Sequence, residues 1–459
     1  MPVEPTQTSP HLYNLFPRLA VDMRAWRSHA ERAARMGFDW LYLNPVHFPG
    51  FSGSCYAVKD FFRIDPLLLP AGHPDKNWDE PQRGDGGMAA LRTALEAVRD
   101  CGLRPVMDLV LNHTARDSTL VLEHPGWYVR DAQGDIQSPS AIDPADARNV
   151  TVWGDLAEID NEHSPDREAL WAYWKRVVST YAELGFEGFR CDAAYKVPAA
   201  LWRELIATAQ QIRPDARFFG ETLGARLEDV AALRESGLHF TFNSSKWWAF
   251  DAAWCLDQQR DLPDGARSVS FPESHDTPRL WAESGGCEAA QRQRYAVAAA
   301  FASGLLMPVG YEFGFMRQID VVTTRVEHWE APQVDLTAFV ARVNAVRRRI
   351  PALCSDTVVA LSAFDQPALL LEKRAGEDAA WIAINKDLVA PQALELPEVA
   401  RGKRVWRVCR DAAVPAPRFE AWREAGIPGL AELVDARGRF DEGSGERLEL
   451  EPGEVVYLS

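Results

Sequence analysis

The chain has 459 residues, of which 47% are hydrophobic and 25% charged, a balance typical of globular domains with substantial cores. Its 50 basic and 66 acidic residues give a net charge of −16, which repels phosphate backbones and anionic lipids. We therefore expect neither a nucleic-acid partner nor a membrane partner. The N-terminus lacks a signal-peptide pattern and the seven cysteines include no CxxC pair, so we expect a cytoplasmic protein with reduced thiols.

Short apolar runs alternate with amphipathic stretches from about residue 12 to residue 350. The runs that we expect to be strands are 12–15, 39–44, 103–111, 186–190, 217–220, 238–243, 268–271 and 304–310. Helices are expected between them, at about 26–36, 91–101, 167–183, 198–212, 245–260 and 287–302. Eight strand–helix units predict an α/β fold, a parallel (β/α)8 TIM barrel.

Two segments break this alternation. Residues 113–166 are rich in Pro, Asp, Gly and Ser and predict a small domain inserted after the third strand. The chain after residue 354 predicts a C-terminal antiparallel β-sandwich domain, at 355–459, with strands near 369–374, 379–386, 403–410 and 454–459. The catalytic barrel would then comprise residues 1–112 and 167–354.

Polar side chains follow four of the predicted barrel strands. Asp108 to His113 end the third strand, and Arg190 and Asp192 end the fourth. Glu221 follows the fifth, and His275 with Asp276 follows the seventh. Each feature alone is more often a helix cap than a catalyst. Four of them at the face where barrels place catalytic groups predict one active site.

Paired carboxylates suit glycoside hydrolysis with retention, which needs a nucleophile and an acid about 5–5.5 Å apart. Asp192 and Glu221 follow adjacent strands, and neighbouring strands lie about 4.8 Å apart. Arg190 stands two residues before Asp192 and so points to the same side of its strand. Its guanidinium is expected to keep Asp192 ionised.

The four segments resemble the four motif regions of the α-amylase family, glycoside hydrolase family 13. Region one is Asp108 to His113, region two is 188–192, region three is 220–221 and region four is 275–276. Further segments are similar to the family's fifth motif, its segment after strand 2 and its strand 8 ending, at 153–160, 52–66 and 307–314. The resemblance covers residues 12 to about 330.

The resemblance implies a role for each matching residue. Asp192 would be the nucleophile, Glu221 the general acid and then base, and Asp276 a stabiliser of the transition state. The residues implied in substrate binding are Tyr56 as a stacking platform, His113 and His275 as hydroxyl ligands, Arg190 as the group that orients Asp192, and Asp108.

The sequence departs from the family pattern on the acceptor side. Tyr195 and Lys196 stand where α-amylases have Lys-His, so we expect a different acceptor subsite there. Ser274 replaces an Asn that usually precedes region four. Asn112 and acids of the inserted domain could hold a structural calcium, and no cofactor is expected to be required. Trp153, Trp247, Trp248 and Trp329 lie near predicted strand ends or loops, and one or two of them are expected to line subsites.

The activity first expected is a retaining glycoside hydrolase that cleaves α-1,4-glucosidic bonds of maltodextrin or glycogen-type α-glucans through a covalent glycosyl-Asp192 intermediate. The alternative is an intracellular 4-α-glucanotransferase or maltosyltransferase with the same site, and the opening 13–18 is similar to bacterial maltosyltransferases of the family. The remaining alternatives are a non-catalytic α-glucan-binding protein and a barrel enzyme of unrelated chemistry, such as a metal-dependent aldolase.

Overall fold

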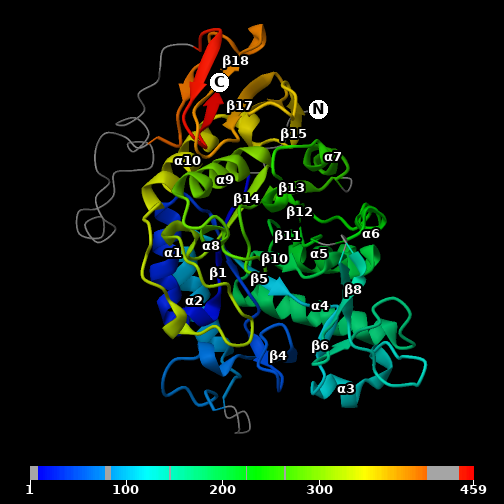
Figure 1. The fold of residues 1–459 in the computed structure, drawn as a ribbon. Helices are drawn as coiled ribbons and strands as arrows, with labels where there is room; N and C mark the ends of the chain where they lie inside the picture. Colours follow the sequence, from blue (N-terminus) through cyan, green and yellow to red (C-terminus); the bar gives the residue numbers. More distant parts are fainter. Residues whose placement is uncertain (1–8, 78–83, 144–145, 224, 263–264, 411–443) are drawn as a thin grey trace.

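The computed structural model describes residues 9–77, 84–143, 146–223, 225–262, 265–410 and 444–459 (Figure 1). Eight parallel strands close into a barrel in the order β1-β2-β5-β10-β11-β12-β13-β14. Their bounds are β1 His11–Leu15, β2 Trp40–Leu43, β5 Arg104–Leu109, β10 Gly188–Cys191, β11 Arg217–Gly220, β12 Phe240–Phe242, β13 Arg267–Ser270 and β14 Gly304–Pro308. The predicted barrel is confirmed, and every barrel strand overlaps a predicted apolar run.

Helices follow the strands and cover the outside of the barrel (Figure 1). They are α1 Trp26–Arg35, α2 Met88–Asp100, α4 Arg167–Leu184, α5 Ala199–Ile212, α6 Leu227–Ala231, α7 Trp254–Arg260, α8 Leu280–Glu283, α9 Glu288–Phe301 and α10 Thr337–Arg349. Large apolar side chains such as Trp40, Phe219 and Phe240 pack together within the barrel. Within the described residues, the helices are all too short or too polar to cross a membrane.

The prediction of one continuous helix over 245–260 is wrong. The structure has a 3₁₀ turn at Ser245–Trp247, and helix α7 begins only at Trp254. Phe250 lies between them with φ of 64°, a left-handed conformation that an α-helix cannot contain. The Trp248 indole nitrogen also donates to the Ala252 carbonyl at 2.8 Å, which fixes the chain in a loop.

Two excursions surround the open end of the barrel. A hairpin of β3 (His47–Pro49) and β4 (Val58–Ile64) follows β2 and carries the loop that contains Tyr56. The second excursion lies between β5 and α4. Its elements are β6 His113–Ala115, α3 Thr119–Glu123, β7 Ser140–Asp143, β8 Asp146–Val152 and β9 Leu156–Glu158. The antiparallel pairs β6–β9 and β7–β8 make this segment a small β-rich unit.

The chain after α10 forms antiparallel sheets. One sheet has the order β15-β16-β17-β21-β19, and a second pairs β18 with β20. The bounds are β15 Thr357–Ala360, β16 Ala368–Ala375, β17 Asp378–Asn385, β18 Gln392–Glu395, β19 Val405–Trp406, β20 Arg447–Leu450 and β21 Val455–Leu458. Apolar residues of both sheets share one core, which confirms the predicted β-sandwich.

The strand expected at 403–410 is much shorter, since only Val405–Trp406 pairs with β21. The sandwich and the β6–β9 segment lie at opposite ends of the molecule (Figure 1). Tyr457 of β21 donates to the Ala296 carbonyl of α9 at 2.6 Å and so fastens the sandwich to the barrel helices.

Candidate active site

A pocket lies at the end of the barrel where the parallel strands finish. Barrel enzymes place their catalytic groups at this face because all eight strands deliver side chains to it. The pocket is lined by Tyr42, Arg190, Glu221, Leu223, Phe242, Phe271, Ser274, His275, Asp276 and Leu306. Residues of three predicted motifs therefore meet in one cavity with an apolar floor.

Asp108, near the end of β5, lies beneath this cavity and is only 1% exposed. Its carboxylate accepts hydrogen bonds from Tyr42 at 2.5 Å and Tyr56 at 2.6 Å, and it pairs with Arg190 at 2.8 Å. Burial raises the pKa of Asp108, against the effect of Arg190. With three donors around it, Asp108 holds Arg190 and both tyrosines in place.

Arg190 on β10 connects the carboxylates of the site. Its Nη1 lies 2.6 Å from Asp192, and its Nη2 lies 3.5 Å from Glu221. The strand register explains this, because Arg190 stands opposite Asp108 of β5, and residues two apart on a strand share a side. The predicted pairing of Arg190 with Asp192 is present, and Glu221 shares the same guanidinium.

The two carboxyls that share Arg190 have different electrostatic surroundings. Burial raises the pKa of Glu221 to about 7, with Arg190 opposing the shift and the charge of Asp192 adding to it. Burial also raises the pKa of Asp192, again against Arg190. Because Arg190 lies closer to Asp192, it stabilises negative charge there more strongly. Of the two carboxyls, Glu221 is therefore the one that we expect to hold a proton near neutral pH.

Glu221 is also held by the backbone that follows Asp192. The Ala193 N–H donates to Glu221 Oε2 at 2.7 Å. Ala193 has φ of 39°, in the left-handed region that is unfavourable for a residue with a Cβ. Non-glycine residues in this conformation concentrate at functional sites, where the surrounding structure enforces them. Here the conformation turns the N–H toward the carboxylate of the next strand.

His275 and Asp276 complete the opposite wall. His275 Nε2 lies 3.1 Å from the carboxylate of Asp276 and 2.6 Å from the Tyr56 hydroxyl. The Tyr56 and His275 rings are parallel within 4°, with centroids 5.7 Å apart. Burial opposes ionisation of Asp276, but the charge and hydrogen bond of His275 prevail and lower its pKa to about 2. Its side chain remains 52% exposed, so it is open to a ligand.

His113 lies beside this wall at the start of β6. Its Nε2 donates to the Tyr56 carbonyl at 3.2 Å, and burial lowers its pKa to about 4. His113 therefore fixes the loop that carries Tyr56. Its predicted contact with a sugar hydroxyl stays a prediction.

Sequence reasoning missed several groups that position the site. Tyr42 donates to Asp108, and the Asn44 amide donates to the Tyr56 hydroxyl at 3.0 Å. The Gln318 amide donates to the Asp276 carbonyl at 3.3 Å. Tyr42 and Asn44 end the predicted second strand, so the rule applied to the other strand ends would have found them. Gln318 comes from a long loop after β14 that carries no such signal.

Tyr195 and Lys196 lie in the 3₁₀ turn Ala194–Lys196, directly after Asp192. Burial and then the charges of Glu221 and Asp192 raise the pKa of Tyr195. The Lys196 ammonium donates to the Ser140 carbonyl of β7 at 2.7 Å. Lys196 therefore fastens β7 to the turn that carries Tyr195.

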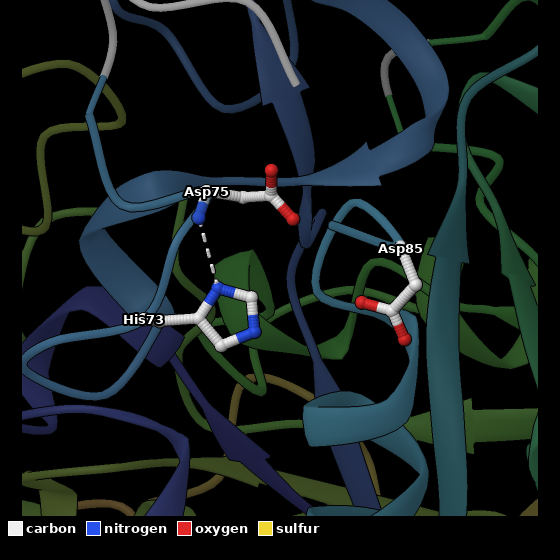
Figure 2. Close-up of side chains that lie close together, drawn as sticks. All are labelled: His73, Asp75 and Asp85. Carbon is white, nitrogen blue, oxygen red and sulfur yellow. Dashed lines mark hydrogen bonds between the residues drawn. The ribbon is translucent and has the colours of Figure 1, made fainter. Parts of the chain in front are cut away.

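A calcium ion at Asn112 stays a prediction. Asn112 Oδ1 is buried without a hydrogen-bond partner, which suits a cation ligand. Among the described residues, the group of His, Cys, Asp and Glu side chains close enough to share a metal is elsewhere, at His73, Asp75 and Asp85 (Figure 2). Asp75 there accepts the Gly84 and Gly86 N–H groups at 3.0 Å, so its carboxylate organises the loop before α2.

Comparison with known proteins adds to this geometry. A family model described as the glucanotransferase domain of glycogen debranching enzyme matches residues 11–132. The α-1,4-glucan:maltose-1-phosphate maltosyltransferase of Burkholderia pseudomallei is 29% identical over 402 residues, which cover 84% of this chain and 34% of that protein. A cyclomaltodextrinase of Geobacillus thermopakistaniensis is 22% identical over 411 residues, which cover 83% of this chain and 65% of that protein.

The fold has close counterparts among solved structures. The crystal structure of an α-amylase from Lactobacillus plantarum superposes with a TM-score of 0.73 at 19% identity, covering 98% of both chains. This chain thus spans about a third of the maltosyltransferase and just under two thirds of the cyclomaltodextrinase. These likenesses agree with the closed barrel and the ordered motifs. They support membership of the α-amylase family, glycoside hydrolase family 13, for this chain.

Proposed function

We propose that the protein is a retaining enzyme that acts on α-1,4-linked glucans by double displacement at Asp192 and Glu221. The observation that carries this proposal is the single Arg190 guanidinium that contacts both carboxyls, at 2.6 Å and 3.5 Å. A shared guanidinium draws them together, which favours the spacing of about 5–5.5 Å used by retaining enzymes over the roughly 6.5–9.5 Å of inverting ones.

In the first displacement the ionised Asp192 carboxylate attacks the anomeric carbon. The bond from that carbon to the glycosidic oxygen breaks, and Glu221 gives its proton to the departing oxygen. The pKa of Glu221, raised to about 7 by burial, keeps it protonated for this step. The product is a glycosyl ester of Asp192, and the leaving sugar carries the proton that came from Glu221.

In the second displacement Glu221 works as a base. It takes a proton from an incoming hydroxyl group, whose oxygen attacks the anomeric carbon and frees Asp192. Asp276 stays ionised because its pKa is about 2. Together with His275, which lines the same pocket, it is placed to hold the hydroxyls of the ring whose bond is cleaved. The stacking of that sugar on Tyr56 stays a prediction.

The incoming hydroxyl decides the activity. Water would make the protein a hydrolase of maltodextrin or glycogen-type glucans. A sugar would make it a glucanotransferase or maltosyltransferase. The second candidate is favoured by the similarity to the Burkholderia maltosyltransferase over 84% of this chain.

The test is a time course of products from maltoheptaose. Hydrolysis predicts only products shorter than the substrate. Transfer predicts longer and shorter products together. With Asp192→Asn, both kinds of product should disappear. Turnover that persists in this variant would contradict the assignment of the nucleophile. An inactive wild-type protein that still binds maltoheptaose would favour the binding-protein alternative.

A further inference from the structure

Arg18 is a buried arginine outside the cluster of catalytic carboxyls. It lies in the 3₁₀ turn Pro17–Leu19 that follows β1, and its side chain is only 2% exposed. Its Nε lies 2.7 Å from the carboxylate of Asp65, which follows β4 and is 1% exposed. This ion pair compensates the buried charge of Arg18 and leaves the other guanidinium nitrogens for further partners.

A second nitrogen of Arg18 joins two loops. Nη1 donates to the Gly53 carbonyl at 2.7 Å and to the Val321 carbonyl at 3.0 Å. Gly53 belongs to the 50–57 loop between β3 and β4. Val321 belongs to the 314–325 loop between β14 and α10. Arg18 therefore connects two loops that lie far apart in the sequence.

The first of these loops carries Tyr56. The Tyr56 hydroxyl lies 2.6 Å from the Asp108 carboxylate and 2.6 Å from Nε2 of His275. The residue before it, Cys55, donates its N–H to the same Val321 carbonyl at 3.1 Å. A single carbonyl oxygen therefore binds both the guanidinium and the backbone that leads into Tyr56.

The second loop carries Gln318, three residues before Val321. The Gln318 amide donates to the main-chain carbonyl of Asp276 at 3.3 Å. The carbonyl of the residue before Gln318 accepts a hydrogen bond from Nε of Arg279 at 3.1 Å. The loop is therefore fixed on both sides of Gln318 by buried arginines, Arg279 on one side and Arg18 on the other.

The burial of Arg18 carries a cost in stability. Within the residues that the structure describes, its remaining nitrogen, Nη2, is buried with no hydrogen-bond partner. A buried charged group with an unpaired donor lowers the free energy of unfolding. Local costs of this kind are typical of places where the arrangement of a functional site takes precedence over stability.

We propose that Arg18 is a positioning residue for the reaction. It joins the loop of Tyr56 to the loop of Gln318 and thereby keeps Asp276 in the place where it stabilises the transition state. Asp276 touches the substrate, whereas Arg18 acts through the two loops and needs no contact with the sugar. This inference rests on the proposed function and adds a residue to it.

The first test is Arg18→Lys. The variant keeps a positive charge opposite Asp65, but an ammonium cannot donate to a carboxylate and two carbonyls with the geometry of a guanidinium. With maltoheptaose, kcat should fall about 10-fold and KM should change less than about twofold, because the misplaced group acts in the transition state. A lower Tm with an unchanged kcat would mean that Arg18 only stabilises the fold, and would overturn the proposal.

A double-mutant cycle tests the path through the 314–325 loop. Gln318 is exposed, so Gln318→Ala should fold like the wild type. It should lower kcat by about fivefold, the effect of one lost hydrogen bond. Arg18→Lys combined with Gln318→Ala should be no slower than Arg18→Lys alone, because the first change already releases Gln318. Independent effects would multiply to about 50-fold, and that result would overturn the path.

The matched control is Arg104→Lys. Arg104 likewise combines an ion pair, with Glu187 at 2.7 Å, and a hydrogen bond to a carbonyl, that of Asp215 at 2.8 Å. It begins β5, so it lies at the opposite end of the barrel, and its replacement should leave kcat and KM unchanged. A wild type that does not turn over maltoheptaose would refute the proposed function and this inference with it. An active wild type with an equally active Arg18→Lys variant would overturn the inference alone.

Discussion

The site has two regions of opposite character. Around Arg190 the groups are buried and hydrogen-bonded to one another, with Asp108 only 1% exposed and Arg190 only 3% exposed. In contrast, Trp153 is 40% exposed and Trp247 is 52% exposed. Under the proposed function, we expect the chemistry to depend on the buried cluster and the choice of acceptor to depend on the exposed side chains.

The largest expected effect comes from the buried cluster. Asp192→Asn removes the nucleophile and should lower kcat by about 10⁴-fold or more. The fold should survive, since asparagine keeps the shape of the side chain and its polar atoms. Steady-state rates with maltoheptaose test this, and circular dichroism checks the fold. A loss of less than tenfold would mean that another group attacks the sugar.

Glu221→Gln should have the next largest effect. General acid–base groups contribute roughly 10²–10⁴-fold. In the wild type, kcat/KM should fall as the pH rises through about 7, because Glu221 loses the proton needed for the first step. The variant should lack this alkaline limb. A wild-type profile that stays flat from pH 6 to pH 9 would contradict the assignment of the acid.

The Glu221→Gln substitution is also expected to raise the stability of the folded protein, by an amount that depends on pH. The pKa of Glu221 rises from 4.5 to about 7 on folding, so the folded state binds this proton more tightly than the unfolded state. The stability of the wild type should therefore decline as the pH rises from about 4.5 to 7. Glu221→Gln should unfold at a higher temperature than the wild type at pH 8, and the difference should shrink toward pH 5. Equal differences at both pH values would contradict the buried environment of Glu221.

The smallest effect is expected at Lys196. Lys196→Met removes the bond to the Ser140 carbonyl and frees β7 from the turn beside Tyr195. The ratio of transfer to hydrolysis products should change by about fivefold, the equivalent of about 1 kcal/mol for one hydrogen bond. Arg203→Met serves as the control, because Arg203 contacts the carbonyl and the carboxylate of Glu235 on the outside of the barrel. A ratio equal to that of the wild type would mean that Lys196 has no part in the choice of acceptor.

The barrel could be predicted from the sequence because its buried parallel strands read as short apolar runs separated by helical periods. The sequence did not predict the hairpin β3–β4, because buried residues recur at every third position of β4 and not with the period of two that is typical of a half-buried strand. The prediction of one helix over 245–260 is wrong because hydrophobic periodicity carries no information about the left-handed backbone conformation of Phe250.

For the site, strand-end positions located Asp108, Arg190, Asp192, Glu221 and Asp276, and the structure brings them together. The pKa values could not be predicted, since they depend on burial. The sequence suggested that Arg190 alone sets the state of Asp192, whereas burial pushes the pKa of both carboxyls upward. The division between exposed Trp153 and buried Trp248 likewise depends on tertiary packing.

The most direct test of the central claim is to trap the glycosyl-enzyme. A donor with a good leaving group, such as α-maltosyl fluoride, needs little help from the acid. In Glu221→Gln it should therefore glycosylate the nucleophile faster than water removes the sugar. Mass spectrometry of the digested protein should find one maltosyl group on the peptide that contains Asp192. Turnover of the fluoride with no adduct, or an adduct on any other carboxylate, would contradict the mechanism.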